Sequence, residues 1–345
     1  MYTVPSKKML PLIILEILRR QTDSEHRLTQ RQITEILESE YQIKADRKTV
    51  KRNLMNLIEY GFEIEYSETE RTNPDGETET IMSDWFIRHD FEDSEIRLLV
   101  DSLLFSFQIP SRQRQELISK LEGLSSRHFE SKVKHIQALP DISATNQQLF
   151  YTISVLDEAI EKKTKVGFHY GQFNNKGKLE PRRGYAGEEQ RHVVDPYQLV
   201  ATNGRYYLIC CKSNFDDLSY YRVDRILDIA LTEQPARPLR SIPGYENGLD
   251  LPRHMSERLY MFSGSIVRAS FIAKRWALVH IFDWFGQDAD VVDVDDDHVK
   301  VRVRVSEQAM LYWALQFSEY VEVLEPATLR DSLRTAGEAI SEKYR

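Results

Sequence analysis

The chain has 345 residues, of which 41% are hydrophobic and 29% are charged, with only 14 Gly and 12 Pro. This composition excludes a disordered, collagen-like or low-complexity protein and predicts a soluble globular chain of roughly two to three domains. No apolar run approaches the roughly 18 residues that span a bilayer, and the N-terminus lacks a signal-peptide pattern, so we expect a cytoplasmic protein without a membrane partner.

The net charge is −8, which ordinarily disfavours binding to nucleic acid, but the charges are segregated along the chain. The last fifth of the sequence is strongly acidic. A short basic run near the N-terminus, broken by the single acid Asp46, contains Lys44, Arg47, Lys48, Lys51 and Arg52. The overall charge therefore does not exclude a local surface that binds nucleic acid.

Three helices are predicted at the start of the chain. Apolar residues with helical spacing indicate a helix over residues 7–20. Thr29 and Gln32 match a capping box and begin a second helix. A third helix begins at Asp46 and ends at Gly61, where a left-handed residue is favoured.

A β-hairpin is predicted after the third helix. Residues 62–66 and 81–87 have strand patterns, and the sequence at 73–76, Asn-Pro-Asp-Gly, is a strong turn signal. Three helices followed by a hairpin predict a winged helix-turn-helix DNA-binding domain over residues 1–90.

The face of the third helix opposite its apolar stripe combines cations with short polar side chains. Arg and Lys bind phosphate or guanine, and Asn pairs with adenine, so such a face suits the major groove of duplex DNA. The hairpin is acidic and has a single basic residue in its central part. The predicted DNA-binding residues are Arg47, Lys48, Thr49, Lys51, Arg52, Asn53 and Asn56, with Arg71 from the hairpin. The alternative is a solvated, mixed-charge helix in a small helical domain.

Two amphipathic helices, over residues 94–105 and 111–124, carry no chemistry and form a predicted helical linker over 91–140. Their apolar faces suggest a scaffold and a dimer contact. A further helix then introduces short strands separated by frequent turns, which predicts a small β-barrel over 141–234. Cys210 and Cys211, the only cysteines, are adjacent in an apolar run and are interpreted as buried packing residues.

Three motifs of this barrel resemble the WYL-domain family of bacterial transcriptional regulators. They are Val-Val-Asp-Pro-Tyr-Gln-Leu at 193–199, Asn-Gly-Arg-Tyr-Tyr-Leu at 203–208 and Tyr-Arg-Val-Asp-Arg-Ile at 221–226. The triplet that names the family is Tyr206-Tyr207-Leu208 here, which differs in its first letter only, and Ser219 replaces an Arg often found at that position. The resemblance implies a small Sm- or SH3-like barrel that serves as a sensor domain.

The resemblance implies an effector of nucleotide type or a single-stranded nucleic acid, with Arg222 and Arg225 as anion contacts and Tyr207 near the pocket. Aromatic rings stack on bases while guanidinium groups bind phosphate, which agrees with that chemistry. The predicted ligand-binding residues are Tyr170, Arg182, His192, Tyr197, Arg205, Tyr207, Tyr221, Arg222 and Arg225. The alternative is that the tyrosines and His192 are ordinary core residues and that Asp224 or Asp195 pairs with Arg225 or Arg222.

A linker rich in Pro and Gly is predicted over 235–260, followed by strand, helix, strand, strand, helix and strand over 261–345. This order is typical of ferredoxin-like folds and resembles the WCX-type extension found beside WYL domains. The acidic segment 293–298 lacks the Gly and distal Glu of a calcium loop, so we interpret it as a solvated turn and predict no metal. The predicted fold class is α+β and multidomain.

Known catalytic motifs are missing from the sequence, so we predict neither an enzyme nor a cofactor. The leading hypothesis is a sequence-specific transcriptional regulator that binds a double-stranded operator as a homodimer and responds to an effector in the WYL domain. One alternative is an accessory module of a defence system whose barrel binds a partner protein or RNA. Another is a plain repressor whose barrel only dimerises.

Overall fold

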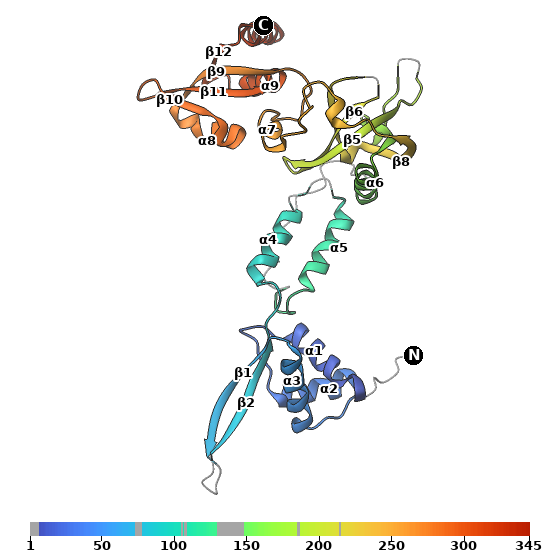
Figure 1. The fold of residues 1–345 in the computed structure, drawn as a ribbon. Coiled ribbons are helices and arrows are strands. Elements are labelled where there is room, and N and C mark those ends of the chain that lie inside the picture. Colours follow the sequence, from blue (N-terminus) through green and yellow to red (C-terminus); the bar gives the residue numbers. More distant parts are fainter. Residues whose placement is uncertain are drawn as a thin grey trace. The chain divides into compact units, whose positions relative to one another are not determined.

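The computed structural model describes residues 7–72, 78–104, 106, 109–129, 148–184, 187–213 and 215–345. The chain is a mixed α and β protein with several antiparallel sheets, and it divides into two compact units, Met1–Ser143 and Ala144–Arg345 (Figure 1). Within the described ranges, no helix combines the length and apolar character needed to cross a membrane.

The three helices predicted at the start of the first unit are present. Thr29 and Gln32 form the predicted capping box, and the Asp46 carboxylate accepts a hydrogen bond from the Thr49 amide at the start of the third helix. Gly61 ends that helix with a φ of 114°. The elements in chain order are a short 3-10 turn (Lys7–Met9), α1 (Leu10–Gln21), α2 (Gln30–Tyr41), α3 (Arg47–Tyr60), β1 (Ile64–Thr72) and β2 (Thr78–Ile87).

Strands β1 and β2 pair antiparallel, and the predicted turn at 73–76 between them lies outside the described residues. The base of this two-stranded sheet is anchored in the helical core, because Trp85 is fully buried and its backbone pairs with Leu28 before α2. The core itself consists of apolar side chains from all three helices, including Ile14, Leu37 and Leu54. Burial of these side chains determines which face of each helix remains free.

Two further helices, α4 (Asp93–Leu104) and α5 (Ser111–Glu122), follow in the same unit. They are held together by a small apolar cluster of Ile96, Val100 and Phe129, against which Ile118 and Leu121 of α5 pack. The segment after α5 returns to the first helices, where the Ser126 hydroxyl donates to Asp23 at 2.7 Å. The rings of His26 and His128 stack beside this bond at 3.6 Å.

The second unit begins with α6 and a six-stranded antiparallel sheet. Strand β3 contacts three others, because β5 and β8 flank its first part and β4 pairs with its end. The sheet order is β4-β3-β5-β6-β7, with β8 returning to β3. The elements are α6 (Leu149–Lys162), β3 (Thr164–Phe173), β4 (Leu179–Pro181), β5 (Arg191–Thr202), β6 (Arg205–Lys212), β7 (Leu218–Arg222), a 3-10 turn (Val223–Arg225) and β8 (Ile226–Pro235). Cys210 and Cys211 are fully buried and free of disulfides, which confirms their interpretation as packing residues.

The segment predicted as a linker over 235–260 contains regular structure and is docked on the sheet. It forms a 3-10 turn (Leu239–Ser241) and helix α7 (Leu251–Ser256). Ile242 is fully buried in a cluster with Ile209 and Leu218. The apolar residues between the Pro and Gly positions therefore pack on strands β6 and β7, which the local composition did not indicate.

The last part of the second unit contains a four-stranded antiparallel sheet of order β10-β11-β9-β12. Its element order agrees with the prediction, and its core is built around Phe271, Phe285 and Trp313. The elements are β9 (Ile266–Lys274), a 3-10 turn (Arg275–Ala277), α8 (Leu278–Phe285), a 3-10 turn (Gly286–Asp288), β10 (Asp290–Asp293), β11 (His298–Ser306), α9 (Glu307–Gln316), β12 (Val321–Glu325) and α10 (Ala327–Lys343).

Candidate functional site

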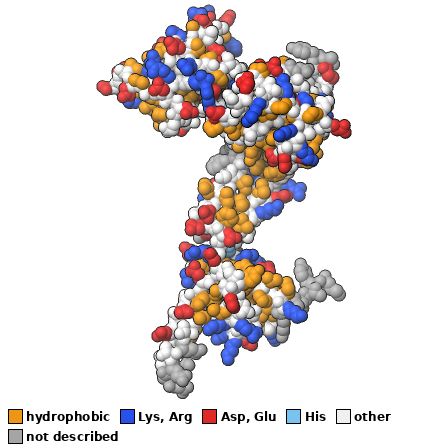
Figure 2. Space-filling view, viewed as in Figure 1, with side chains coloured by type: hydrophobic (Ala, Val, Ile, Leu, Met, Phe, Trp, Pro, Cys, Tyr) orange, Lys and Arg blue, Asp and Glu red, His pale blue; other side chains and the backbone are white. Residues whose placement is uncertain are grey.

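One face of α3 is cationic and exposed, while its other face is buried in the three-helix core. Val50, Leu54 and Leu57 supply the buried side. Basic side chains gather over this part of the first unit in the space-filling view (Figure 2). Packing of the apolar face therefore orients the cations of α3 toward solvent.

The structure separates the predicted DNA-binding residues into two groups. Arg47, Lys48, Arg52 and Asn56 are exposed, and Thr49 and Lys51 are half-buried on the flank of the helix.

Asn53 differs from the prediction, because it is only 8% exposed and its amide nitrogen donates to the Thr49 carbonyl at 2.7 Å. Helical periodicity contained this signal, because at 100° per residue position 53 lies about 40° from Leu57 and about 60° from Val50. Asn53 is therefore a residue of the helix flank rather than of the exposed face.

A cleft of about 420 Å³ adjoins the beginning of α3. Its lining includes Arg52 together with two lysines from other segments, Lys8 and Lys44. Lys44 also forms an exposed ion pair with Glu38 at 3.4 Å. Lys44 belongs to the basic run of the sequence, but neither it nor Lys8 was predicted as a site residue, because neither lies on the third helix.

The two-stranded sheet presents mainly acidic residues. Arg71 is exposed near the end of β1, where its Cα pairs with that of Glu79. Glu68 and Glu70 are exposed on the same strand. Cationic contacts to a polyanion must therefore come mostly from α3 and its surroundings.

In the second unit, three of the predicted ligand-binding residues form one aromatic cluster. The Tyr221 hydroxyl lies 3.3 Å from Nδ1 of His192, and the rings of Tyr170 and Tyr221 meet edge to face at 4.9 Å. Burial raises the pKa of both tyrosines. Burial also lowers the pKa of His192, and the nearby charges of Lys212 and Arg182 add to this effect. These shifts all favour the uncharged forms of the three side chains.

Arg222 and Arg225 have different surroundings. The Arg222 guanidinium makes two bonds to Asp224, Nε to Oδ1 at 3.0 Å and Nη2 to Oδ2 at 2.6 Å. The pairing that the sequence analysis kept as an alternative is thus present for Arg222.

Arg225 lies over the ring of Phe173 at 5.4 Å, and its buried Nε has no hydrogen-bond partner among the described residues. Its positive charge also acts on the Tyr170 hydroxyl. Arg225 can therefore still bind an anion, whereas most of the donors of Arg222 are already occupied by Asp224.

Of the remaining predicted residues, Arg182 adjoins the cluster, because its backbone amide donates to the Tyr170 carbonyl at 2.9 Å. Tyr207 lies opposite Arg222 in the β6–β7 register, and Arg182 and Arg205 are exposed. Tyr197 packs instead on the cluster beneath the docked linker, where burial and the charge of Asp195 raise its pKa.

A buried ion pair that the sequence analysis did not predict lies beside Tyr197. Asp195 is fully buried, and its Oδ1 accepts from Lys165 at 2.8 Å and from the backbone amide of Arg237 at 2.9 Å. These bonds join β3, β5 and the start of the linker. The Asp of the Asp-Pro-Tyr motif thus has a structural role.

The acidic turn after β10 is organised by Arg275 and His298. Arg275 donates to the Asp293 carboxylate at 2.9 Å and to the carbonyl oxygens of Asp295 and Asp296. Nδ1 of His298 lies 2.9 Å from Asp295. Across the described residues, no group of three or more His, Cys, Asp or Glu side chains is arranged to hold a metal ion.

Comparison with known proteins identifies two domains in the second unit, a WYL domain over residues 151–231 and a WCX domain over residues 267–341. An uncharacterized HTH-type transcriptional regulator of Bacillus subtilis (strain 168), YobV, is 22% identical over 150 residues. That match covers 43% of this chain and 45% of YobV, less than half of either protein.

Two solved structures show weak similarity. Proteasome accessory factor B/C of Arthrobacter aurescens matches 94% of this chain and 47% of its own, with 15% identity and a TM-score of 0.29. A CRISPR Cas-related protein matches 75% of this chain and 74% of its own, with 14% identity and a TM-score of 0.26.

Proposed function

We propose that this chain, which contains a WYL domain and a WCX domain, is a transcriptional regulator that binds duplex DNA through α3. The observation that carries the proposal is the exposed cationic face of α3 on a helix whose other face is locked in a core. Three helices followed by a two-stranded antiparallel sheet have the element order of a winged helix-turn-helix domain. The similarity to an HTH-type transcriptional regulator supports the same class of function.

The dimensions of α3 suit a major groove. Its 14 residues extend over about 21 Å, and the major groove is about 12 Å wide. Lys48, Arg52 and Asn56 follow one another at intervals of four residues and form a stripe along one side. We assign Lys48 and Arg52 to phosphate or guanine contacts and Asn56 to adenine.

We further propose that the WYL domain senses a nucleotide-type or single-stranded nucleic-acid effector beside the aromatic cluster. Arg225 is the principal anion contact, because no carboxylate among the described residues pairs with its guanidinium, whereas Arg222 is held by Asp224. Arg182 supplies a second, exposed cation whose charge already acts on His192. Effector binding alters regulation only if the effector has different affinities for the DNA-bound and free states.

The test is a salt titration of the full-length protein on duplex DNA from upstream of its own gene, beside a scrambled duplex. The Lys48→Ala/Arg52→Ala variant should lose selective binding and reduce the salt slope by about 2, since each lost phosphate contact contributes about 0.9. Arg330→Ala/Lys343→Ala, which removes two exposed cations from α10, is the matched control and should bind as the wild type does.

Two asparagines test the orientation of α3. Asn56→Ala should lower the preference for the selected duplex by about 1–3 kcal/mol, because a base contact is lost. Asn53→Ala should leave that preference unchanged, because Asn53 bonds to its own helix. Equal, weak binding to both duplexes that is insensitive to these substitutions would refute DNA recognition and would favour a protein or RNA partner.

A further inference from the structure

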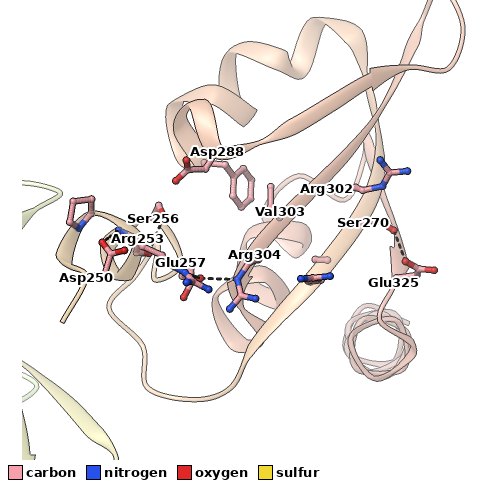
Figure 3. A pocket seen from close by; sticks show the side chains of 14 residues that line it. Asp250, Arg253, Ser256, Glu257, Ser270, Asp288, Arg302, Val303, Arg304 and Glu325 are labelled. Atoms are coloured by element: carbon pink, nitrogen blue, oxygen red, sulfur yellow. Dashed lines mark hydrogen bonds and ion pairs between the residues drawn. The ribbon is translucent and has the colours of Figure 1, made fainter. Parts of the chain in front are cut away.

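A cleft of about 730 Å³ lies within the second unit, between helix α7 and strands β9, β11 and β12. This volume is in the range of small-molecule sites and exceeds what an inorganic ion requires. Apolar residues, including Phe285 and Val303, contribute to its lining beside charged groups from the strands and α7 (Figure 3). None of these residues belongs to the WYL domain.

The strand register places two arginines of this cleft directly opposite each other. Arg304 of β11 and Arg268 of β9 are Cα partners in the antiparallel pair, and both side chains are exposed. Like charges at directly opposed positions destabilise a sheet unless a counter-charge compensates them. The strand register therefore concentrates positive charge at this end of the cleft.

The protein supplies only part of that compensation. Glu257 Oε1 accepts from Arg304 Nε at 2.8 Å and from Arg253 Nε at 3.0 Å, so one carboxylate serves two guanidinium groups (Figure 3). Burial acts to raise the pKa of Glu257, but the hydrogen bonds from Arg304 and Arg253 outweigh it and keep the pKa low. The Arg268 side chain has no hydrogen bond or ion pair to any described residue.

The other acids of the cleft are engaged elsewhere or lie apart from this pair. Asp250 caps α7 by accepting from the Arg253 amide, and Glu325 accepts from the Ser270 hydroxyl at 3.3 Å. Arg302, the fourth arginine of the lining, is paired with Asp290 at 3.1 Å. Arg253 and Arg304 thus share Glu257, while Arg268 beside Arg304 has no acidic partner among the described residues.

We propose that this cleft is a binding site for a small organic anion, whose phosphate or carboxylate group lies between Arg268 and Arg304. The planar guanidinium presents paired N–H donors that match either oxyanion. Asp288 and Glu325 also line the cleft and suit hydrogen-bond donors on the same ligand. The site is independent of α3 and of the WYL-domain cluster, so it does not depend on DNA binding.

The experiment is isothermal titration calorimetry of the full-length protein at physiological salt with inorganic phosphate, phenyl phosphate and benzoate. Phenyl phosphate should bind more tightly than inorganic phosphate, because the cleft has room and apolar lining for a ring. Comparison of phenyl phosphate with benzoate distinguishes a phosphate-bearing ligand from a carboxylate-bearing one. Arg268→Ala should weaken binding of the preferred probe at least tenfold. Arg268→Lys should weaken it less, because Lys keeps the positive charge but lacks the paired N–H donors of the guanidinium.

Arg330→Ala, at an exposed arginine of α10 outside this cleft, is the matched control and should bind as the wild type does. Arg268→Lys keeps the test decisive if the alanine variant does not fold. The proposal is overturned if none of the three probes binds at concentrations up to about 10 mM, or if folded Arg268 variants bind the preferred probe with wild-type affinity.

Discussion

His254 should make the stability of the second unit depend on pH. It lies in α7, is 7% exposed, and its Nε2 is 2.9 Å from the Tyr220 hydroxyl of β7. Burial lowers its pKa from 6.5 to about 4, and the positive charge of Arg258 adds to this effect while Glu257 opposes it. The neutral ring can accept a hydrogen bond from the Tyr220 hydroxyl at Nε2, whereas a protonated ring carries a proton on that nitrogen and cannot.

The sign follows from the two pKa values. Because the folded-state pKa is lower than the unfolded one, the unfolded chain binds the proton first as the pH falls. Stability is therefore complete above about pH 6.5 and is lost progressively toward pH 4. At about 1.36 kcal/mol per pKa unit, the full loss is about 3 kcal/mol, of which about 2 kcal/mol falls between pH 7 and pH 5.

The assay is urea unfolding of the full-length protein and of His254→Gln at several pH values from 7.5 to 5. Gln has no titrating group in this range, and its side-chain oxygen can still accept from Tyr220. Between pH 7.5 and pH 5, the free energy of unfolding of the wild type should fall by about 2 kcal/mol more than that of the variant, because the other histidines contribute equally to both proteins. Parallel stability curves for the two proteins would refute the reasoning.

Three further substitutions test the packing on which the candidate sites depend. Asp195→Ala should destabilise the second unit by about 3–5 kcal/mol in urea unfolding, because Lys165 then lacks its buried carboxylate partner. Adding Lys165→Met to this variant should restore part of the lost stability, and no restoration would contradict the pairing. Asp46→Ala should lower the melting temperature of the first unit, because the cap of α3 is lost, whereas Asp46→Asn should change it little. Equal decreases for the two variants would argue against capping. Leu54→Ala should cost about 2–5 kcal/mol and lower the unfolding midpoint of the first unit alone, measured by limited proteolysis in denaturant; a shift in both units would show that they unfold together.

Most helices and strands, and their order along the chain, were predictable from the sequence, because capping groups and apolar periodicity act over a few residues. Thr29 and Gln32 predicted the start of α2, and Gly61 predicted the end of α3. The order of strands and helices in the C-terminal module followed from its alternating patterns. The exposed face of α3 was predictable for the same reason, since the buried stripe of one helix determines its opposite side.

Contacts between distant segments were decided only by the tertiary structure. Sequence alone left Arg222 and Arg225 equivalent, and packing distinguished them by pairing one with Asp224 and placing the other over Phe173. The opposition of Arg268 and Arg304 follows from the β9–β11 register, which no local pattern encodes. The sequence by itself thus determined most of the elements and their apolar faces, with α7 as an exception, because those depend on short-range spacing. The tertiary structure decided which charges meet, because strand register and packing bring together residues that are far apart in the chain.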